Sequence, residues 1–569
     1  MRNRSPASRN QSVAPIDSGG AFLRRGVCRI LRQARGSRTH ALWPALILAL
    51  AGALHLLWVT QPHGPGLTPD SAYYLAGADG VRAGQGIQDF QGRPLYSWPP
   101  LYPVVLALTT QALGADPVDA ALFMNVLLYG TVLFLVGRWL LRQVTDRWLV
   151  LVGLLLLGLA FPSFDAAKYV LSESVFHLFL WLFLLGMGGW LHACRNPGAS
   201  VIAVWPLLLA GVGAAGANMT RLIGLVLLLV GPAILLLAGG AIPWRRRWGH
   251  GLLFLATGAT PFLLWAIHNK MVHGRYLQTR GYNEQLPVAL MERLREVTIT
   301  LSNWLVPHWV SHGIGMLLLT VATGMILVWG MKRSQENGLL RLQEAAVLPL
   351  AVFPPLYLGG VIAAASIFGT DPIGDRFLMP LYAPLLLLAL KAGDGLLPRN
   401  GLWRRGVGVG LLVWSAVVPA QWTLAVDGLE RQRGIGSSPY FFSRQEWRDS
   451  ALIDHLRRQP PPGVLYSNVP DVLYALVGRS ALLSPRKQDQ ARDAQVAHMI
   501  ARVCAGESLH LIWFNRNLRI NMAVPDRLRG PLGLQEVVRS ADGSLFELHP
   551  PCPRRLTPKD VPPLVFYGW

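Results

Sequence analysis

The stretch that decides the fold is "ALWPALILALAGALHLLWVT", residues 41–60, which contains no Asp, Glu, Lys or Arg. A helix needs about 20 mainly apolar residues to cross a bilayer, so this stretch predicts a membrane-spanning segment. The run "RLIGLVLLLVGPAILLLAGG" at 221–240 has the same character. Of the 569 residues, 52% are hydrophobic and only 15% are charged, whereas soluble domains carry about a quarter charged residues. The sequence therefore predicts a polytopic α-helical membrane protein.

Hydrophobic runs predict about eleven transmembrane helices. The segment "PPLYPVVLALTTQALG" (99–114) is too short for a comfortable span. Counting it as a span would also reverse the sides of all later loops, so we expect an interfacial helix in the first outer loop. No internal repeat stands out, which disfavours transporters built from inverted repeats. The predicted spans are 41–60, 117–140, 148–162, 172–192, 201–218, 221–240, 250–268, 313–331, 345–367, 376–392 and 405–423.

The arginines predict which side of the membrane each loop occupies. With 99–114 left out of the count, the alternate loops "LRQVTDRW", "HACRNPGAS", "PWRRRWGH", "MKRSQENGLLRLQ" and "KAGDGLLPRNGLWRR" are basic or carry arginine. Basic loops stay in the cytoplasm. Residues 1–40, with nine arginines and one acidic residue, predict a mostly disordered cytoplasmic tail. The net charge of +21 therefore reflects topology rather than a nucleic-acid partner.

Three regions follow: a basic tail (1–40), a transmembrane domain (41–423) and a small α/β domain (424–569) on the periplasmic side. The last region is charged and proline-punctuated, with strand patterns at "GVLYSN" and "SLHLIWF" and a hairpin pattern at "LQEVVRSADGSLFELHP". Its Cys504 and Cys552 could pair if this region is exported. The four cysteines lack metal-type spacing. We expect a multi-pass protein of the inner (plasma) membrane with a cytoplasmic N-terminus.

Two acidic residues stand out on the predicted outer face. In "TPDS", Thr68 is placed to cap a helix that begins at Pro69, so Asp70 falls in its first turn. Such a carboxylate could take a proton from a hydroxyl or bind a cation. An isolated Asp at this position is more simply a favourable helix-terminal charge. Glu173 begins the fourth span, where ionisable residues are costly and often functional. Asp165, in the preceding loop, is a weaker candidate.

Two arginines lie at the outer mouths of apolar runs: Arg221 in "NMTRLIG" and Arg376 in "GDRFLMP". Interfacial arginines commonly anchor lipid phosphates. Two of them on the same side as two acids favour an anionic ligand, because Arg pairs with phosphate in a bidentate manner. His268 is a candidate helper. Tyr73 and Tyr74 read as interface anchors, with sugar stacking as a second role.

Taken in order, "PDSAYYLAGA", "SWPPLYPVVLAL", "LSESVFHL", "NMTRLIGL" and "GDRFLMPLYAPLLLLAL" resemble the GT-C superfamily of integral-membrane glycosyltransferases. The likeness is greatest to bacterial relatives of the protein O-mannosyltransferases and the lipid A aminoarabinose transferases. It covers roughly residues 41–424, and many members also carry an exported tail.

The resemblance implies a sugar transferase that uses a polyprenyl-phosphate donor. It implies that Asp70 is the catalytic base, that Glu173 is the second acid, and that Arg376 and Arg221 bind the donor phosphate. The acceptor would be a hydroxyl of a protein, a glycan or a lipid. A divalent cation is left open, since its presence varies across the superfamily.

One position departs from the aminoarabinose transferases, which have a lysine just before the Pro-Pro pair. This chain has Trp98 there. The donor contacts of that branch therefore do not carry over, although Arg93 is a candidate substitute for the lysine. The alternative function is a transporter or flippase for a lipid-linked sugar, in which ionisable residues should lie along a path near the bilayer midplane. The sequence names neither the sugar nor the acceptor.

Overall fold

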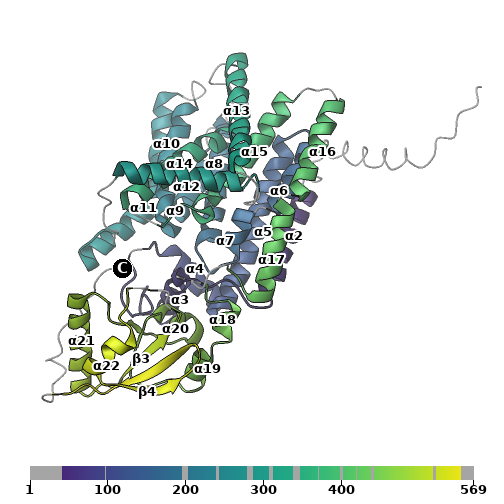
Figure 1. Ribbon diagram of the computed structural model, residues 1–569. Coiled ribbons are helices and arrows are strands. Elements are labelled where there is room, and N and C mark those ends of the chain that lie inside the picture. Colours follow the sequence, from purple (N-terminus) through teal and green to yellow (C-terminus); the bar gives the residue numbers. More distant parts are fainter. Residues whose placement is uncertain are drawn as a thin grey trace, which may run out of the picture.

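The structure of the chain, a computed structural model, consists of a helical bundle with a small sheet domain at one end (Figure 1). The predicted tail at 1–40 lies outside the described residues. The structure describes residues 42–552 except 97, 160, 195–202, 239–242, 278–285, 307–311, 338–345, 369–370, 398–400, 418, 437–440, 517–518 and 520.

Within these residues, nine helical segments are long and apolar enough to cross a membrane, and they coincide with nine of the eleven predicted spans. The other two predictions coincide with shorter apolar helices, Val204–Thr220 and Leu222–Leu237. The chain is a multi-pass membrane protein. Its bundle contains α2 (Leu42–Thr60), α5 (Pro117–Gln143), α6 (Arg147–Gly158), α7 (Phe161–Ala167), α8 (Glu173–Cys194), α9 (Val204–Thr220), the 3₁₀-helix η1 (Leu222–Val226), α10 (Leu227–Leu237), α11 (Trp244–His273), α12 (Leu286–Asn303), α13 (His312–Asn337), α14 (Leu348–Phe368), α15 (Asp375–Leu396), α16 (Gly401–Val417) and α17 (Pro419–Arg433).

The first helix shows how the bundle divides its surface between protein and lipid. Ala45 and Ala49 of α2 are buried, whereas Trp43, Ile47 and Leu54 are more than half exposed. Small residues on the buried face let neighbouring helices approach closely, as α2 does with α5. Large apolar side chains on the exposed face of α2 are stable only against lipid. This agrees with a membrane-spanning position.

The first outer loop contains two short helices, α3 (Pro69–Arg82) and α4 (Leu101–Leu113). As predicted, Thr68 caps α3: its side chain accepts a hydrogen bond from the Ser71 amide, and the Ser71 side chain accepts one from the Thr68 amide. The 13 residues of α4 are too few to cross a bilayer. It packs against α3 and α5.

The C-terminal domain is a five-stranded mixed sheet flanked by helices, in the order β2-β1-β3-β5-β4. Strand β1 is parallel to β2 and β3, and β5 is antiparallel to β3 and β4. The predicted strands and hairpin are present; β2 and α22 were not predicted. The elements are α18 (Gln445–Arg448), α19 (Ala451–Arg458), β1 (Val464–Ser467), α20 (Pro470–Val477), β2 (Leu482–Leu483), α21 (Asp489–Cys504), β3 (Leu509–Phe514), α22 (Pro525–Leu532), β4 (Leu534–Arg539) and β5 (Gly543–Leu548).

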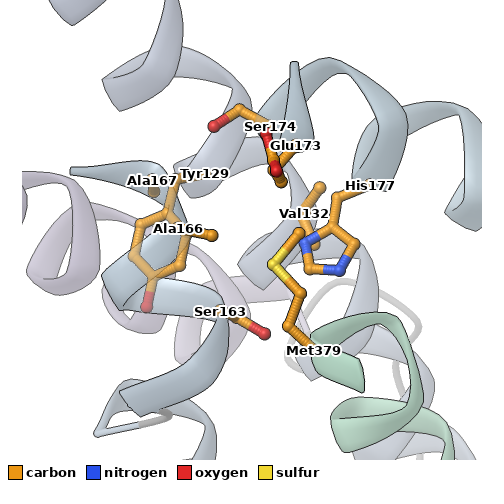
Figure 2. A pocket seen from close by; sticks show the side chains of 9 residues that line it. All are labelled: Tyr129, Val132, Ser163, Ala166, Ala167, Glu173, Ser174, His177 and Met379. Atoms are coloured by element: carbon orange, nitrogen blue, oxygen red, sulfur yellow. The ribbon is translucent and has the colours of Figure 1, made fainter. Parts of the chain in front are cut away.

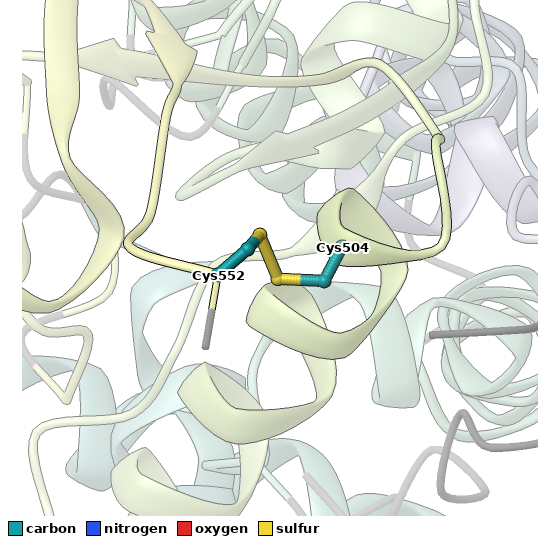
Figure 3. Close-up of a disulfide and its surroundings, with 2 residues drawn as sticks. All are labelled: Cys504 and Cys552. Atoms are coloured by element: carbon teal, nitrogen blue, oxygen red, sulfur yellow. A yellow bond between two sulfur atoms is a disulfide. The ribbon is translucent and has the colours of Figure 1, made fainter. Parts of the chain in front are cut away.

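A disulfide joins Cys504, the last residue of α21, to Cys552, which follows β5 (Figure 3). The pairing that the sequence left open is therefore present. It ties the outer helix α21 to the end of the sheet across a sequence separation of 48 residues.

We expect Cys552→Ser to weaken the C-terminal domain by about 2–4 kcal/mol, because the open chain gains conformational freedom when unfolded. Limited proteolysis of the full chain in detergent should cleave this domain faster in the variant. Cys194→Ser, at a free cysteine of α8, is the matched control and should leave the cleavage rate unchanged. Equal rates for Cys552→Ser and the unaltered chain would contradict the expectation.

Candidate active site

The segment before α3 is joined to the segment before α8 by backbone and side-chain hydrogen bonds. The Gly66 amide donates to the Lys168 carbonyl (2.7 Å), and the Val170 amide donates to the Gly66 carbonyl (2.9 Å). The Tyr74 hydroxyl donates to the Ser172 hydroxyl at 3.0 Å. These bonds bring the first turns of α3 and α8 together, although the two helices are far apart in the sequence.

The four principal residues predicted from the sequence meet at this place. Arg376 Nη1 lies 2.7 Å from Asp70 Oδ2, across 306 residues of sequence. Arg376 Nε also donates to Glu173 Oε1, and Arg221 forms an ion pair with the same oxygen. The Glu173 side chain is completely buried, whereas those of Asp70 and Arg376 are about one-third exposed (32% and 36%). The cluster therefore has a closed end at Glu173 and an open end at Asp70.

Three helix N-termini point at the cluster. Asp70 is in the first turn of α3, Glu173 is the first residue of α8, and Arg376 follows the first residue of α15. The positive end of a helix dipole favours an anion and disfavours a cation. Both carboxylates are therefore well placed, and Arg376 is held there by its two acidic partners. The two guanidinium groups balance the two carboxylates. The three helix N-termini are the remaining favourable contribution to binding an anion beside Arg376.

Arg221 reaches the cluster because a helix breaks at this residue. α9 ends at Thr220, Arg221 has an extended backbone (φ −146°, ψ 136°), and η1 starts at Leu222. The break requires close approach of η1 to α9. A Cβ on Gly224 would lie 2.5 Å from the backbone of Ala217, so glycine is needed there.

Arg376 is held by contacts that the sequence did not reveal. Trp304 Nε1 donates to Asp375 Oδ1 at 2.6 Å, and the Tyr357 hydroxyl donates to the Phe377 carbonyl at 3.0 Å. Both bonds fix the first turn of α15. A tryptophan in an outer loop gives no sequence signal for this role, because interfacial tryptophans are common in membrane proteins.

A small cavity lies behind Glu173 (Figure 2). Its lining includes Tyr129 on one side and His177 with Met379 on the other, with Glu173 and Ser174 between them. Glu173 Oε2 and Ser174 Oγ are buried and have no hydrogen-bond partner in the part of the chain that the structure describes. About 10 Å³ is open to the centre of a water molecule, which is room for roughly one water to bond both atoms.

Tyr74 of α3 is not the membrane-interface anchor that the sequence suggested, because it is buried. Tyr74 is 6% exposed, and burial raises its pKa to about 12, so it remains a neutral donor to Ser172. The Tyr73 ring packs against Phe90 and Trp98, with centroid distances of 4.7 and 4.9 Å. Burial also raises the Tyr73 pKa. Trp98, at the position of the missing lysine, serves as a packing residue.

The remaining predicted helpers lie outside the cluster. Arg93 pairs with Asp89, with Nε and Nη2 at 2.8 and 2.7 Å from Asp89 Oδ2. Its role as a substitute for the missing lysine stays a prediction. His268 is exposed on α11, and it makes no hydrogen bond or ion pair with the four clustered residues in the described structure. Asp165 pairs with Lys168 at 3.0 Å in a different group of charges.

This second group was missed by the sequence analysis. The fully buried Lys168 also pairs with Asp427 (3.5 Å) and Glu430, and His55 lies 3.0 Å from Asp427. It joins α2 and α17 to the segment leading into α8. A usable signal was present at His55 alone, because it is an ionisable residue inside the first predicted span, and such residues need partners. Asp427 lies beyond the last predicted span and gave no such signal.

Comparison with known proteins identifies the architecture. No protein-family model matches the sequence, and no curated protein matches it significantly. The chain is similar in structure to ArnT from Cupriavidus metallidurans in the apo state, a GT-C glycosyltransferase, with a TM-score of 0.57 and 14% identity over 89% of this chain and 97% of that chain. The structure of the same protein bound to undecaprenyl phosphate gives a TM-score of 0.56 at 14% identity, over 89% and 98%. The chain has a GT-C-like fold.

A divalent cation does not fit the acids of this GT-C-like fold as they are arranged. Both carboxylates already pair with arginine, and a cation at Glu173 would face two guanidinium charges. Within the described residues, no group of three or more His, Cys, Asp or Glu side chains is placed to hold a metal ion. The cation that the sequence left open thus has no fitting site at Asp70 and Glu173.

We expect Glu173→Gln to lower the stability of the protein by about 3–5 kcal/mol, because it leaves two partly buried arginines without their shared partner. Unfolding of the purified protein in mixed micelles by added SDS measures this change.

The matched control is Glu446→Gln, whose carboxylate pairs with Arg444 on the surface. An exposed pair of this kind contributes about 0–1 kcal/mol. Equal stability losses for the two variants would show that the Glu173 pairs are not stabilising.

Proposed function

We propose that the protein transfers a sugar from a polyprenyl-phosphate donor to an acceptor hydroxyl at the periplasmic face of the inner membrane. The observation that carries the proposal is the convergence of Asp70, Glu173, Arg221 and Arg376 at one partly open place. The fold gives further support, because it resembles that of ArnT, which has been crystallised with undecaprenyl phosphate.

The donor phosphate would bind at the arginines. Arg376 is the more exposed of the two, and its planar guanidinium can hold two phosphate oxygens at once. Three helix N-termini add favourable dipoles at the same place. The polyprenyl chain would lie against the apolar outer surfaces of the membrane helices, so the bilayer itself would bring the donor to the site.

Asp70 would act as the base. When the phosphate takes over Arg376, the Asp70 carboxylate loses its ion pair and can accept the proton of the acceptor hydroxyl. The acceptor oxygen then attacks the anomeric carbon from the face opposite the phosphate. The bond between that carbon and the phosphate oxygen breaks, and its electron pair leaves with the polyprenyl phosphate. Arg376 and Arg221 stabilise the negative charge that develops there. A single displacement of this kind inverts the anomeric configuration.

Glu173 would act through the arginines rather than on the acceptor. Its side chain is fully buried, and one oxygen holds both Arg221 and Arg376. It therefore fixes the spacing of the two cations that bind phosphate, as a positioning residue.

Two observations support the periplasmic placement. The C-terminal domain contains a disulfide, and disulfides persist mainly in oxidising compartments such as the bacterial periplasm. This domain also contacts α3, the helix that carries Asp70. The site and the domain therefore lie at the same end of the bundle, and the basic loops predict that the other end, with the N-terminus, is cytoplasmic.

We expect Asp70→Asn to lower turnover about 100- to 10,000-fold, since an amide cannot accept the proton. The measurement is transfer of label from undecaprenyl-phosphate sugars to acceptors in isolated membranes. A flippase would move the lipid but form no new glycosidic bond, so labelled product also separates the two functions.

The control for this variant is Asp116→Asn. Asp116 caps α5 by accepting a hydrogen bond from the Val118 amide at 2.8 Å, and asparagine caps equally well. Its turnover should match that of the unaltered protein. Wild-type turnover in a folded Asp70→Asn variant would rule out Asp70 as the base.

We expect Arg376→Lys to weaken binding of undecaprenyl phosphate about tenfold, because an ammonium group cannot make the bidentate contact. Binding can be followed by native mass spectrometry of the purified protein. Arg458→Lys, on the exposed side of α19, is the matched control and should bind normally. Unchanged binding by Arg376→Lys would remove Arg376 from the phosphate site.

A further inference from the structure

The helix that carries Asp70 lies between the membrane bundle and the C-terminal domain (Figure 1). Tyr74 and Leu75 face the core of the bundle. Ala72 and Ala76 face a separate small cluster that contains Tyr474 of α20. The small side chains on this face let α20 approach closely. α3 is therefore in contact with both parts of the molecule.

One polar bond joins α20 to the far end of α3. The Tyr474 hydroxyl donates to Asp79 Oδ2 at 2.7 Å, across 395 residues of sequence. Burial and the neighbouring Asp79 raise the pKa of Tyr474, so its hydroxyl keeps the proton that it donates. The Tyr474 ring also lies near Phe90, with a centroid distance of 6.4 Å.

The helix α20 is itself firmly held within its domain. Pro470 occupies its first turn, and Asp471 accepts two hydrogen bonds from Arg519, each at 3.0 Å. Arg519 also donates to the Asn468 carbonyl at 3.0 Å, which fixes the residue just before the helix. Tyr474 therefore projects from a rigid support.

The near end of α3 is held by the same half of the chain. The Phe442 amide donates to the Leu67 carbonyl at 2.8 Å, and the Leu67 amide donates to the Ser443 hydroxyl at 3.4 Å. Leu67 precedes the cap of α3. Asp70 and Asp79 lie about 14 Å apart along the helix, at 1.5 Å per residue. Because contacts hold α3 near both of these residues, the helix cannot pivot.

We propose that Tyr474 is a positioning residue for the transfer reaction: its bond to Asp79 fixes α3, and α3 in turn holds Asp70 against Arg376. The C-terminal domain then helps to set the geometry of the active site. This inference rests on the proposed function, because it assigns Tyr474 a role in setting the geometry of the base.

The test removes only the hydroxyl, in the full-length protein in nanodiscs. Tyr474→Phe should lower kcat about 3- to 10-fold, the range expected for loss of one hydrogen bond, and leave the KM for the lipid donor within twofold. Amide hydrogen exchange should become faster in peptides covering residues 69–82. The matched control is Tyr466→Phe, in the sheet core of the same domain, which should change neither quantity.

A double-mutant cycle tests the partner. Asp79→Ala also removes the exposed Asp79–Arg82 pair within α3 (3.1 Å), which contributes little. It should therefore reproduce the loss in kcat, and Tyr474→Phe combined with Asp79→Ala should lose no more than Asp79→Ala alone, because both changes remove the Tyr474–Asp79 bond. A merely structural role would lower the unfolding midpoint and leave kcat of the folded enzyme unchanged.

The outcomes separate the two proposals. Unchanged exchange in residues 69–82, or faster exchange with an unchanged kcat, would overturn the role of Tyr474 while leaving Asp70 and the transferase intact. The proposed function would be overturned if no undecaprenyl-phosphate sugar gave labelled product with the unaltered protein. The exchange measurement needs no activity and would still report whether Tyr474 restrains α3.

Discussion

The structure depends on one residue, Arg376, which pairs with two carboxylates that come from different helices. Its Nη1 contacts Asp70 and its Nε contacts Glu173. A cation near a helix N-terminus is unfavourable by itself, and a carboxylate buried without a partner would be far more so. Each group is stable only because the others are present. This mutual dependence holds the first turns of α3, α8 and α15 at a common point.

Much of this arrangement could be predicted from the sequence, because membrane-spanning helices are recognisable as long apolar runs. Within the described residues, the runs located the nine helices that are long enough to span and two shorter apolar helices. The alternation of arginine-rich loops predicted that Asp70, Glu173, Arg221 and Arg376 lie on one face. The capped start of α3 followed from "TPDS", where each residue type has a specific preference at a helix N-terminus.

What the sequence could not predict depends on contacts between distant segments. Lys168 looked like an ordinary loop residue, yet it is fully buried among acids that arrive from α17. Trp304, Tyr357 and Tyr474 act through hydrogen bonds whose partners no local pattern identifies. Tyr74 was misread for the same reason: an aromatic residue near a membrane looks the same in sequence whether it contacts lipid or a buried hydroxyl. Arg93 forms an ion pair with Asp89, and Asp165 forms one with Lys168.

The bonds from residues 442–474 to α3 have a consequence for biogenesis. α3 follows the first span and leaves the ribosome early, whereas Tyr474 is made 395 residues later. At about 5–20 residues per second, this gap lasts roughly 20–80 s. During that time α3 lies at the membrane surface with neither Phe442 nor Tyr474 to hold it. If the C-terminal domain is periplasmic, as we propose, the site becomes complete only after that domain has crossed the membrane and folded. A chain whose export is interrupted would then insert its helices and still lack an ordered site.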